Sequence, residues 1–448
     1  MRAANASLES YGRDHEMRAG LSASPPVDGR PFLSGPISVY KYDSSYDDQK
    51  FIIEFGADKR VLVSARMADL IGLIDGVSST EQIASRLTGK WGARVSASQV
   101  EQVITATLVT TGIVDAPRNL NQSVERRSHD LLGHSLKLTL IPFQVVRKIT
   151  PWLNPIYSWP VAVIGLIAIL VSRLILYSNI QNVKDMAVPP DQYLYVFLVT
   201  VLTVIIHEFG HATAVGRWGG EPGDIGLTLY FVYPALFTDT SGSWRFGRWR
   251  RAAVDAGGAY FQLLCSLVLV VVYLIGKSPI ALWACVAIDS LLILSLNPFF
   301  KFDGYWIVSD IIGVPNLHKA SLRRLGSLCM GAFSKQSLRP AAERMNRWSE
   351  GLLSLYGALL VLFIVAITYL TFSYGVSWIL KYPDLIAGVW AGVSQSSKEQ
   401  AAVVAGILLR FMYQTAVLLG LLVFWYRLAT AAWRVLRGRL FLNRAGVS

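Results

Sequence analysis

The chain of 448 residues is 53% hydrophobic and only 16% charged, which excludes an ordinary soluble enzyme and predicts an integral membrane protein. Its net charge of +12 does not indicate nucleic acid as a partner, because basic residues of membrane proteins gather in cytoplasmic loops. Three widely spaced cysteines predict no disulfide framework. Residues 1–36 lack the apolar core of a secretory signal, so we expect a disordered, cytosolic N-terminus.

Residues 37–118 have the pattern of a small α+β domain. Two β-prone runs, 51–55 and 60–64, flank the sequence GADK and predict a hairpin. Apolar residues at helical spacing over 70–77 then predict a first helix. Two further helices are predicted by capping boxes, formed by Ser78 with Glu81 and by Ser98 with Glu101.

The run VLVSARMADLIGLIDGVSSTEQIASRL in this domain resembles the PqqD-like winged-helix fold, the recognition element of ribosomally made, modified-peptide pathways. In that family a leader peptide adds as a strand beside the hairpin, above a groove walled by the last helix. The resemblance implies that RVLVS or its partner strand forms this groove with the helix from Ser98 to Thr110. The alternative is a winged helix that only docks on the membrane domain or on a partner protein.

A polar linker with an interfacial segment, residues 119–156, leads into an all-α polytopic membrane domain over 157–426. Six spans are predicted, at 157–177, 193–216, 252–276, 279–297, 352–373 and 401–426. Basic residues follow the second, fourth and sixth spans, so we expect a multi-pass protein of a bacterial cytoplasmic membrane with both termini, including a basic tail over 427–448, in the cytosol. The apolar stretch 225–241 is interrupted by Pro234 and predicts a re-entrant hairpin beside a water-filled cavity, with an edge that can hold an extended substrate.

The segment VIIHEFGHATAV, residues 204–215, places ionisable side chains inside an apolar span, where they are costly unless they have a function. His207 and His211 are four residues apart, so both imidazoles project from one helix face and can reach one metal ion. Glu208 falls at the edge of that face, where a general base can act on water without ligating the metal. The pattern predicts a catalytic zinc site rather than packed core histidines.

A catalytic zinc takes three protein ligands, so a third donor must come from elsewhere in the chain. The fourth span ends in LNPFFKFDGYW, where Pro298 ends the helix and Asp303 follows in irregular backbone before Gly304. A fold that brings this segment beside the second span supplies the missing carboxylate. His207 lies roughly 21 Å along its span, which predicts a metal in the cytosolic half of the membrane.

The two motifs together resemble the site-2 protease family of intramembrane zinc metalloproteases, over residues 193–305. The resemblance implies that one Zn²⁺ per chain is bound by His207, His211 and Asp303. It implies that Glu208 is the general base and that Asn297 contacts the substrate or the oxyanion, although capping of the helix end explains Asn297 as well.

The sequence departs from the family's common form at AGGAYFQL, residues 256–263, which replaces a Gly-Pro-x-x-Asn pattern and places Gln262 at the Asn position. The segments FKFDGYW and FTDTSGSWR are more similar to members that carry a PqqD-like domain and occur with modified-peptide clusters, including daptide-type ones. The role of Gln262 stays open.

Other polar residues receive less specific predictions. Asp289 and Arg410 lie within spans, where contacts that orient helices are expected, and Asp239 is expected in a turn. The linker histidines, His129 and His134, predict no second metal site. The single histidines His15 and His318 are expected at the surface.

The expected function is removal of a leader from a modified-peptide precursor by a zinc endopeptidase near the cytosolic side of the membrane. Its partners are the precursor, the lipid bilayer and other maturation or export proteins, with no nucleic acid. One alternative is a regulatory protease that cuts a membrane-anchored signalling protein. Another is a non-catalytic peptide-binding scaffold or export accessory with structural zinc, which has no need of Glu208.

Overall fold

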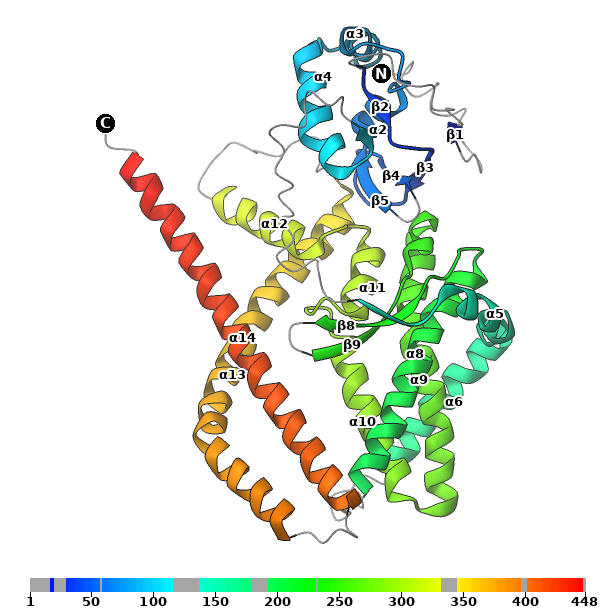
Figure 1. The fold of residues 1–448 in the computed structure, drawn as a ribbon, viewed down its shortest axis with the longest axis vertical. Helices are drawn as coiled ribbons and strands as arrows, with labels where there is room; N and C mark the ends of the chain where they lie inside the picture. Colours follow the sequence, from blue (N-terminus) through cyan, green and yellow to red (C-terminus); the bar gives the residue numbers. More distant parts are fainter. Residues whose placement is uncertain are drawn as a thin grey trace.

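The computed structural model describes residues 17–19, 30–56, 59–115, 137–178, 192–230, 233–331, 345–395 and 401–445. The protein is mostly helical, with small antiparallel sheets. Figure 1 shows a small N-terminal domain stacked on the upper end of a group of long helices. The C-terminal end of the last helix lies toward the same end of the molecule.

The N-terminal domain is built on an antiparallel sheet with the strand order β1-β3-β4-β5. Its helices follow β5, and a short pair, β2 with β6, joins the two ends of the domain. The strands are β1 (Met17–Ala19), β2 (Phe32–Leu33), β3 (Ile37–Tyr42), β4 (Lys50–Phe55), β5 (Lys59–Ser64) and β6 (Val114–Asp115). The helices are α2 (Ala65–Gly72), α3 (Thr80–Trp91) and α4 (Ala97–Val103), the last continued by a π-helical stretch, Ile104–Val109.

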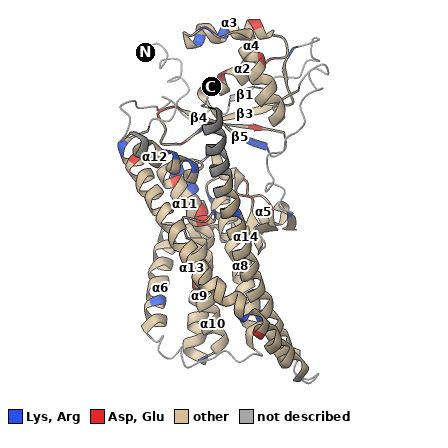
Figure 2. Ribbon diagram, turned by 90° about the vertical axis from the view of Figure 1, so that its left-hand side faces the viewer, with Lys and Arg blue, Asp and Glu red and all other residues tan. Residues whose placement is uncertain are grey.

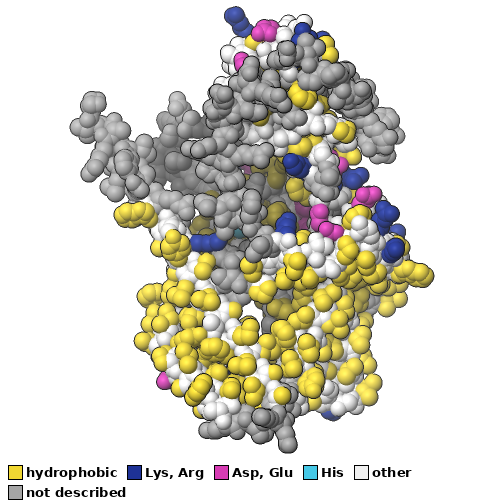
Figure 3. Space-filling view, viewed as in Figure 1, with side chains coloured by type: hydrophobic (Ala, Val, Ile, Leu, Met, Phe, Trp, Pro, Cys, Tyr) yellow, Lys and Arg dark blue, Asp and Glu magenta, His cyan; other side chains and the backbone are white. Residues whose placement is uncertain are grey.

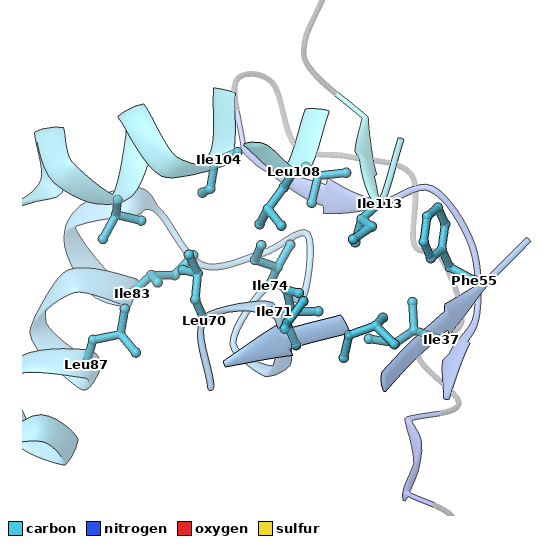
Figure 4. Packing of buried hydrophobic residues seen from close by; sticks show 14 of the residues in the cluster. Ile37, Phe55, Leu70, Ile71, Ile74, Ile83, Leu87, Ile104, Leu108 and Ile113 are labelled. Atoms are coloured by element: carbon cyan, nitrogen blue, oxygen red, sulfur yellow. The ribbon is translucent and has the colours of Figure 1, made fainter. Parts of the chain in front are cut away.

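One hydrophobic core holds this domain together. Figure 4 shows apolar side chains of the sheet and of all three helices, among them Ile37, Ile71 and Leu108, pointing into it. The predicted hairpin is therefore present, with β3 as an additional strand, and three helices follow it. The helix predicted over 70–77 is displaced, because α2 already ends at Gly72 and the chain turns at Gly76 with φ of 76°, which leaves Val77 exposed. Strands β1 and β2 also lie within residues 1–36, which were expected to be disordered; residues 1–16 and 20–29 are outside the described part.

The two capping boxes differ from those predicted. Ser79 with Gln82 caps α3, and Ser96 with Gln99 caps α4. Ser78 is instead held by Asp75, whose carboxylate accepts hydrogen bonds from the Ser78 amide and hydroxyl. A glutamine at the third helical position completes the box as well as a glutamate does, so the sequence left each register ambiguous.

Five helices are long and apolar enough to cross a membrane, by length and composition. They are α6 (Trp159–Ser178), α8 (Tyr193–Arg217), α9 (Arg248–Gly276), α13 (Arg347–Gln395) and α14 (Ala401–Ala445). In Figure 2 charged residues are sparse along the middle of these helices. Figure 3, drawn from the same side as Figure 1, shows hydrophobic side chains covering the lower part of the molecule. These features are compatible with a membrane protein.

The predicted span 279–297 forms a shorter apolar helix, α10 (Pro279–Ser295), of 17 residues. At 1.5 Å per residue it measures about 26 Å, less than the roughly 30 Å of a bilayer core. Pro279 starts the helix at its first position, and the turn at Asn297 and Pro298 ends it early. The chain then enters α11 (Asp303–Ile312) and α12 (Leu317–Gly331).

The last two helices extend well beyond the predicted spans 352–373 and 401–426. Helix α13 has 49 residues with Pro383 inside it, and α14 has 45 residues and runs through most of the expected tail 427–448. Pro383 did not end α13, although the helix bends along its length in Figure 1.

The segment expected to form a re-entrant hairpin is a β-hairpin. Strands β8 (Ile225–Tyr230) and β9 (Tyr233–Thr238) pair with each other, and β7 (Leu138–Ile141) from the interfacial segment pairs with β8. Helix α5 (Phe143–Leu153) follows β7. Because the order is β7-β8-β9, the outer edge of β9 has no strand partner among the described residues.

Candidate metal centre

The second half of α8 carries His207, Glu208 and His211 into the interior of the helical domain. Each of these residues is 6 to 7% exposed, whereas many residues of the first half of the helix are exposed. The Nε2 atoms of His207 and His211 lie 3.0 Å apart. The helical spacing of the motif therefore places both imidazoles at one point, as predicted.

Asp303 completes this cluster. Its Oδ2 atom lies 3.0 Å from Nε2 of His207 and 3.6 Å from Nε2 of His211. Ligands about 2.0 to 2.1 Å from a tetrahedral zinc are separated by about 3.3 Å, so three atoms at 3.0, 3.0 and 3.6 Å fit one zinc ion. Three donors leave one position for water or substrate.

The hydrogen bonds on the far side of each imidazole determine which nitrogen faces the cluster. Nδ1 of His211 donates to the carbonyl oxygen of Val254 at 2.9 Å, and Nδ1 of His207 donates to Oε1 of Gln262 at 3.1 Å. Since both partners accept, the neutral imidazoles present lone pairs at Nε2. Two such lone pairs and a carboxylate oxygen repel one another unless a cation lies between them, so the donor set fits a metal ion.

The carboxylate of Asp303 is fixed in position by a hydrogen bond and favoured in its ionised form. Ser295, the last residue of α10, donates its hydroxyl hydrogen to Oδ2 of Asp303 at 2.7 Å. Burial alone would raise the pKa of Asp303, but positive charge on the adjacent His211 and His207, when they are protonated, outweighs burial and holds that pKa well below its usual range. A metal cation between the three donors would favour the anionic form of Asp303 for the same reason.

Glu208 lies beside the cluster without entering it. Its Oε2 atom is 2.8 Å from the hydroxyl of Thr238, which also lies 3.0 Å from the main-chain oxygen of Glu208. The hydroxyl donates to one of these acceptors at a time. Thr238 is the last residue of β9, so the edge strand and the glutamate meet at the metal centre.

Close packing of α9 against α8 brings the histidines and their supports together. A Cβ atom at Gly258 would overlap the imidazoles of both His207 and His211. A Cβ atom at Gly210 would likewise overlap the backbone of Gly257. The segment AGGAYFQL therefore supplies a glycine face on which the two imidazoles rest, and one turn further on it supplies Gln262.

The remaining predicted residues have local roles. Oδ1 of Asn297 accepts from the amide of Phe299 at 2.9 Å, which forms a local turn in the loop after α10 and caps no helix end. Oδ1 of Asp239 accepts from the amide of Ser241, as expected of a turn residue. Neither belongs to the metal-facing cluster.

Asp289 orients two helices, as expected. It forms an ion pair with Arg173 at 2.9 Å and accepts a hydrogen bond from Tyr177 at 2.8 Å, both on α6. Arg410, for which the same role was expected, is instead exposed on α14, because this part of α14 buries little of its surface against the described residues. His318, predicted at the surface, is instead half-buried, with ring centroids 4.6 Å from Tyr305 and 6.1 Å from Tyr356, because α12 packs against α13. His15, His129 and His134 lie outside the described residues.

The sequence did not reveal three residues that support the centre, Gln262, Ser295 and Thr238. Gln262 occupies the position of an asparagine in the related pattern, which singled it out without giving its role. Ser295 and Thr238 carry no such signal, because hydroxyl residues are common in apolar helices and strands.

Comparisons with known proteins give no further guide to this centre. Neither a protein-family model, nor a curated protein, nor a solved structure matches the chain.

Proposed function

We propose that this protein is a membrane-embedded zinc endopeptidase with one zinc ion bound by His207, His211 and Asp303. The observation that carries the proposal is the convergence of these three donors, with Glu208 beside them and outside the donor set. A structural zinc site has a fourth protein ligand, whereas the described residues offer three.

A zinc ion at this centre would polarise the scissile carbonyl and lower the pKa of the attacking water toward 7. Glu208 would accept the proton of that water and deliver it to the leaving amine. Thr238 positions the Glu208 carboxylate through its hydroxyl, and Gln262 and Val254 keep both imidazoles in the tautomer that ligates. No covalent intermediate with the protein is required.

The substrate we propose is a precursor peptide from which a leader is removed. An extended peptide can add to an open strand edge, and the described part of the chain has such an edge on each side of the contact between the N-terminal domain and the segment after β9. Strand β5 is the edge of the N-terminal sheet, and β9 ends at Glu208. Arg60 of β5 forms a hydrogen bond with Ser241, three residues past the end of β9, so β5 contacts the segment that follows β9.

The two other functions make different predictions. A regulatory protease would act on a membrane-anchored signalling protein with the same metal centre, so only the identity of the cleaved protein separates it from our proposal. A non-catalytic scaffold would retain its function without Glu208.

The test is the substitution Glu208→Gln, which removes the base but leaves the three donors. Peptides from the native host are compared by mass spectrometry between the wild type and the variant. We expect zinc content to be unchanged and an uncut short precursor to accumulate only in Glu208→Gln. Glu221→Gln, the same change at an exposed glutamate beyond α8, is the matched control.

Changed fragments of membrane proteins, with no change in short peptides, would favour the regulatory protease. Unchanged peptide profiles together with bound zinc would favour the scaffold and refute the peptidase.

A further inference from the structure

Helix α11 connects the metal centre with the N-terminal domain. Its first residue is Asp303, the third metal donor, and its last is Ile312, followed by Gly313 in the left-handed conformation with φ of 74°. Ten residues span about 15 Å, so one end of α11 lies at the metal centre and the other lies about 15 Å away, against the N-terminal domain. Figure 1 shows α11 between the N-terminal domain and α10.

The far end of α11 is capped by the N-terminal domain. Ser45, in the loop between β3 and β4, donates its hydroxyl hydrogen to the carbonyl oxygen of Ile312 at 2.6 Å. Its amide donates to the carbonyl oxygen of Gly313 at 2.9 Å. The last carbonyls of a helix lack partners within the helix, so a buried serine that donates to Ile312 and to the following Gly313 helps to fix this end. The hydroxyl of Ser349 on α13 lies 3.5 Å from the same Ile312 oxygen.

The fit at this contact is close. A Cβ atom at Gly313 would lie 2.7 Å from the Ser45 hydroxyl oxygen and 2.8 Å from its amide nitrogen. The loop therefore rests directly on the backbone of α11.

Arg251 of α9 reinforces the same contact from the side. It is 3% exposed, and its Nε donates to Asp310 of α11 at 2.8 Å. One terminal nitrogen donates to the carbonyl oxygen of Asp43 at 3.0 Å, and the guanidinium lies 4.2 Å from the ring centroid of Tyr42. One buried arginine thus joins α9, α11 and the loop that carries Ser45.

The end of α11 that carries Asp303 is packed just as closely. A Cβ atom at Gly304 would overlap the backbone of Leu296, so the helix start rests against the end of α10. A short helix packed this closely moves as one body, because packed interiors do not deform continuously. A shift at Gly313 therefore displaces Asp303.

We infer that docking of the N-terminal domain helps to build the metal centre. Ser45 of that domain and Arg251 of α9 act through α11 to position Asp303. The inference rests on the proposed zinc site and adds to it a dependence on domain docking. The N-terminal domain then does more than bind the substrate, because zinc affinity falls when the loop that carries Ser45 separates from α11.

The test measures zinc affinity of the full-length protein in detergent, by competition with a chromophoric chelator, for Ser45→Ala and Arg251→Gln. Loss of residues that orient metal ligands lowers metal affinity 10 to 100-fold. Because Ser45 and Arg251 act from further away, we expect each substitution to lower zinc affinity roughly tenfold. Absorption of the Co²⁺-substituted protein should change as well, because the position of Asp303 alters the ligand field.

Matched controls make similar changes away from α11. Ser79→Ala removes the cap of α3 in the same domain, and Arg324→Gln breaks the ion pair of Arg324 with Glu350, 3.1 Å apart, between α12 and α13. Both should bind zinc as the wild type does. If Arg251→Gln fails to fold, Ser45→Ala decides the matter alone.

The outcomes separate the two proposals. Wild-type affinity in Ser45→Ala and in any folded Arg251→Gln, with affinity lost in His211→Ala, would overturn the inference and leave the zinc site standing. Equal weakening in the controls would also overturn it, since the effect would then be general loosening. Failure of the wild type to bind zinc, or binding undiminished in His211→Ala, would overturn both proposals.

Discussion

The residue that best tests how the imidazoles are held is Gln262, whose side-chain oxygen accepts from Nδ1 of His207. Gln262→Leu removes the acceptor, and we expect zinc affinity to fall about 10 to 100-fold. Gln262→Glu keeps an acceptor at this position and should retain the affinity of the wild type. Chelator competition on both variants gives the comparison, and equal affinities would show that Gln262 does not orient His207.

Gly258 provides a test of packing at the same scale. In Gly258→Ala the new methyl group would overlap both imidazoles, so α9 and α8 must separate and the donor atoms move apart. We expect loss of bound zinc, measured by metal analysis of the purified protein. Gly276→Ala, at the other end of α9 with open space around it, should keep full zinc content. Zinc retained in Gly258→Ala would mean that the site tolerates this displacement.

At the scale of elements, the ion pair of Arg173 on α6 with Asp289 on α10 fixes the helix that leads to Asp303. Asp289→Leu leaves a buried arginine without its counterion, and we expect a loss of about 3 to 5 kcal/mol in the free energy of unfolding. The double variant with Arg173→Leu should recover most of this loss, because neither charge remains. Thermal unfolding in detergent measures both, and a double variant no more stable than Asp289→Leu contradicts the explanation.

The elements also show what local patterns could predict. Hydrophobic runs located the apolar helices, and the four-residue spacing of His207 and His211 predicted their shared face. The ends of elements were less predictable: α10 ends at Ser295, before the predicted end at 297, whereas α13 continues through Pro383. Each end depends on competing turns and tertiary packing, which a hydropathy pattern does not contain.

At the scale of the whole molecule, pairings between distant segments were the least predictable features. Asp303 was expected beside the histidines because the two motifs resemble a known combination, not because the spacing requires it. The contact of Ser45 with α11 joins residues 267 positions apart, and a serine in a loop gives no sign of such a partner. The same holds for the pairing of β7 with β8.

Coupling between the metal centre and the N-terminal domain must act in both directions. If docking of the loop at Ser45 strengthens zinc binding about tenfold, then zinc strengthens docking by the same factor. We therefore expect added zinc to slow amide hydrogen exchange about tenfold over residues 43–46, and to leave exchange in α3 unchanged. Hydrogen exchange with mass spectrometry, with and without zinc, measures both segments, and His211→Ala should abolish the response. Slowing confined to α8, with none over residues 43–46, would show that the effect of zinc is limited to its ligands and is not transmitted through α11.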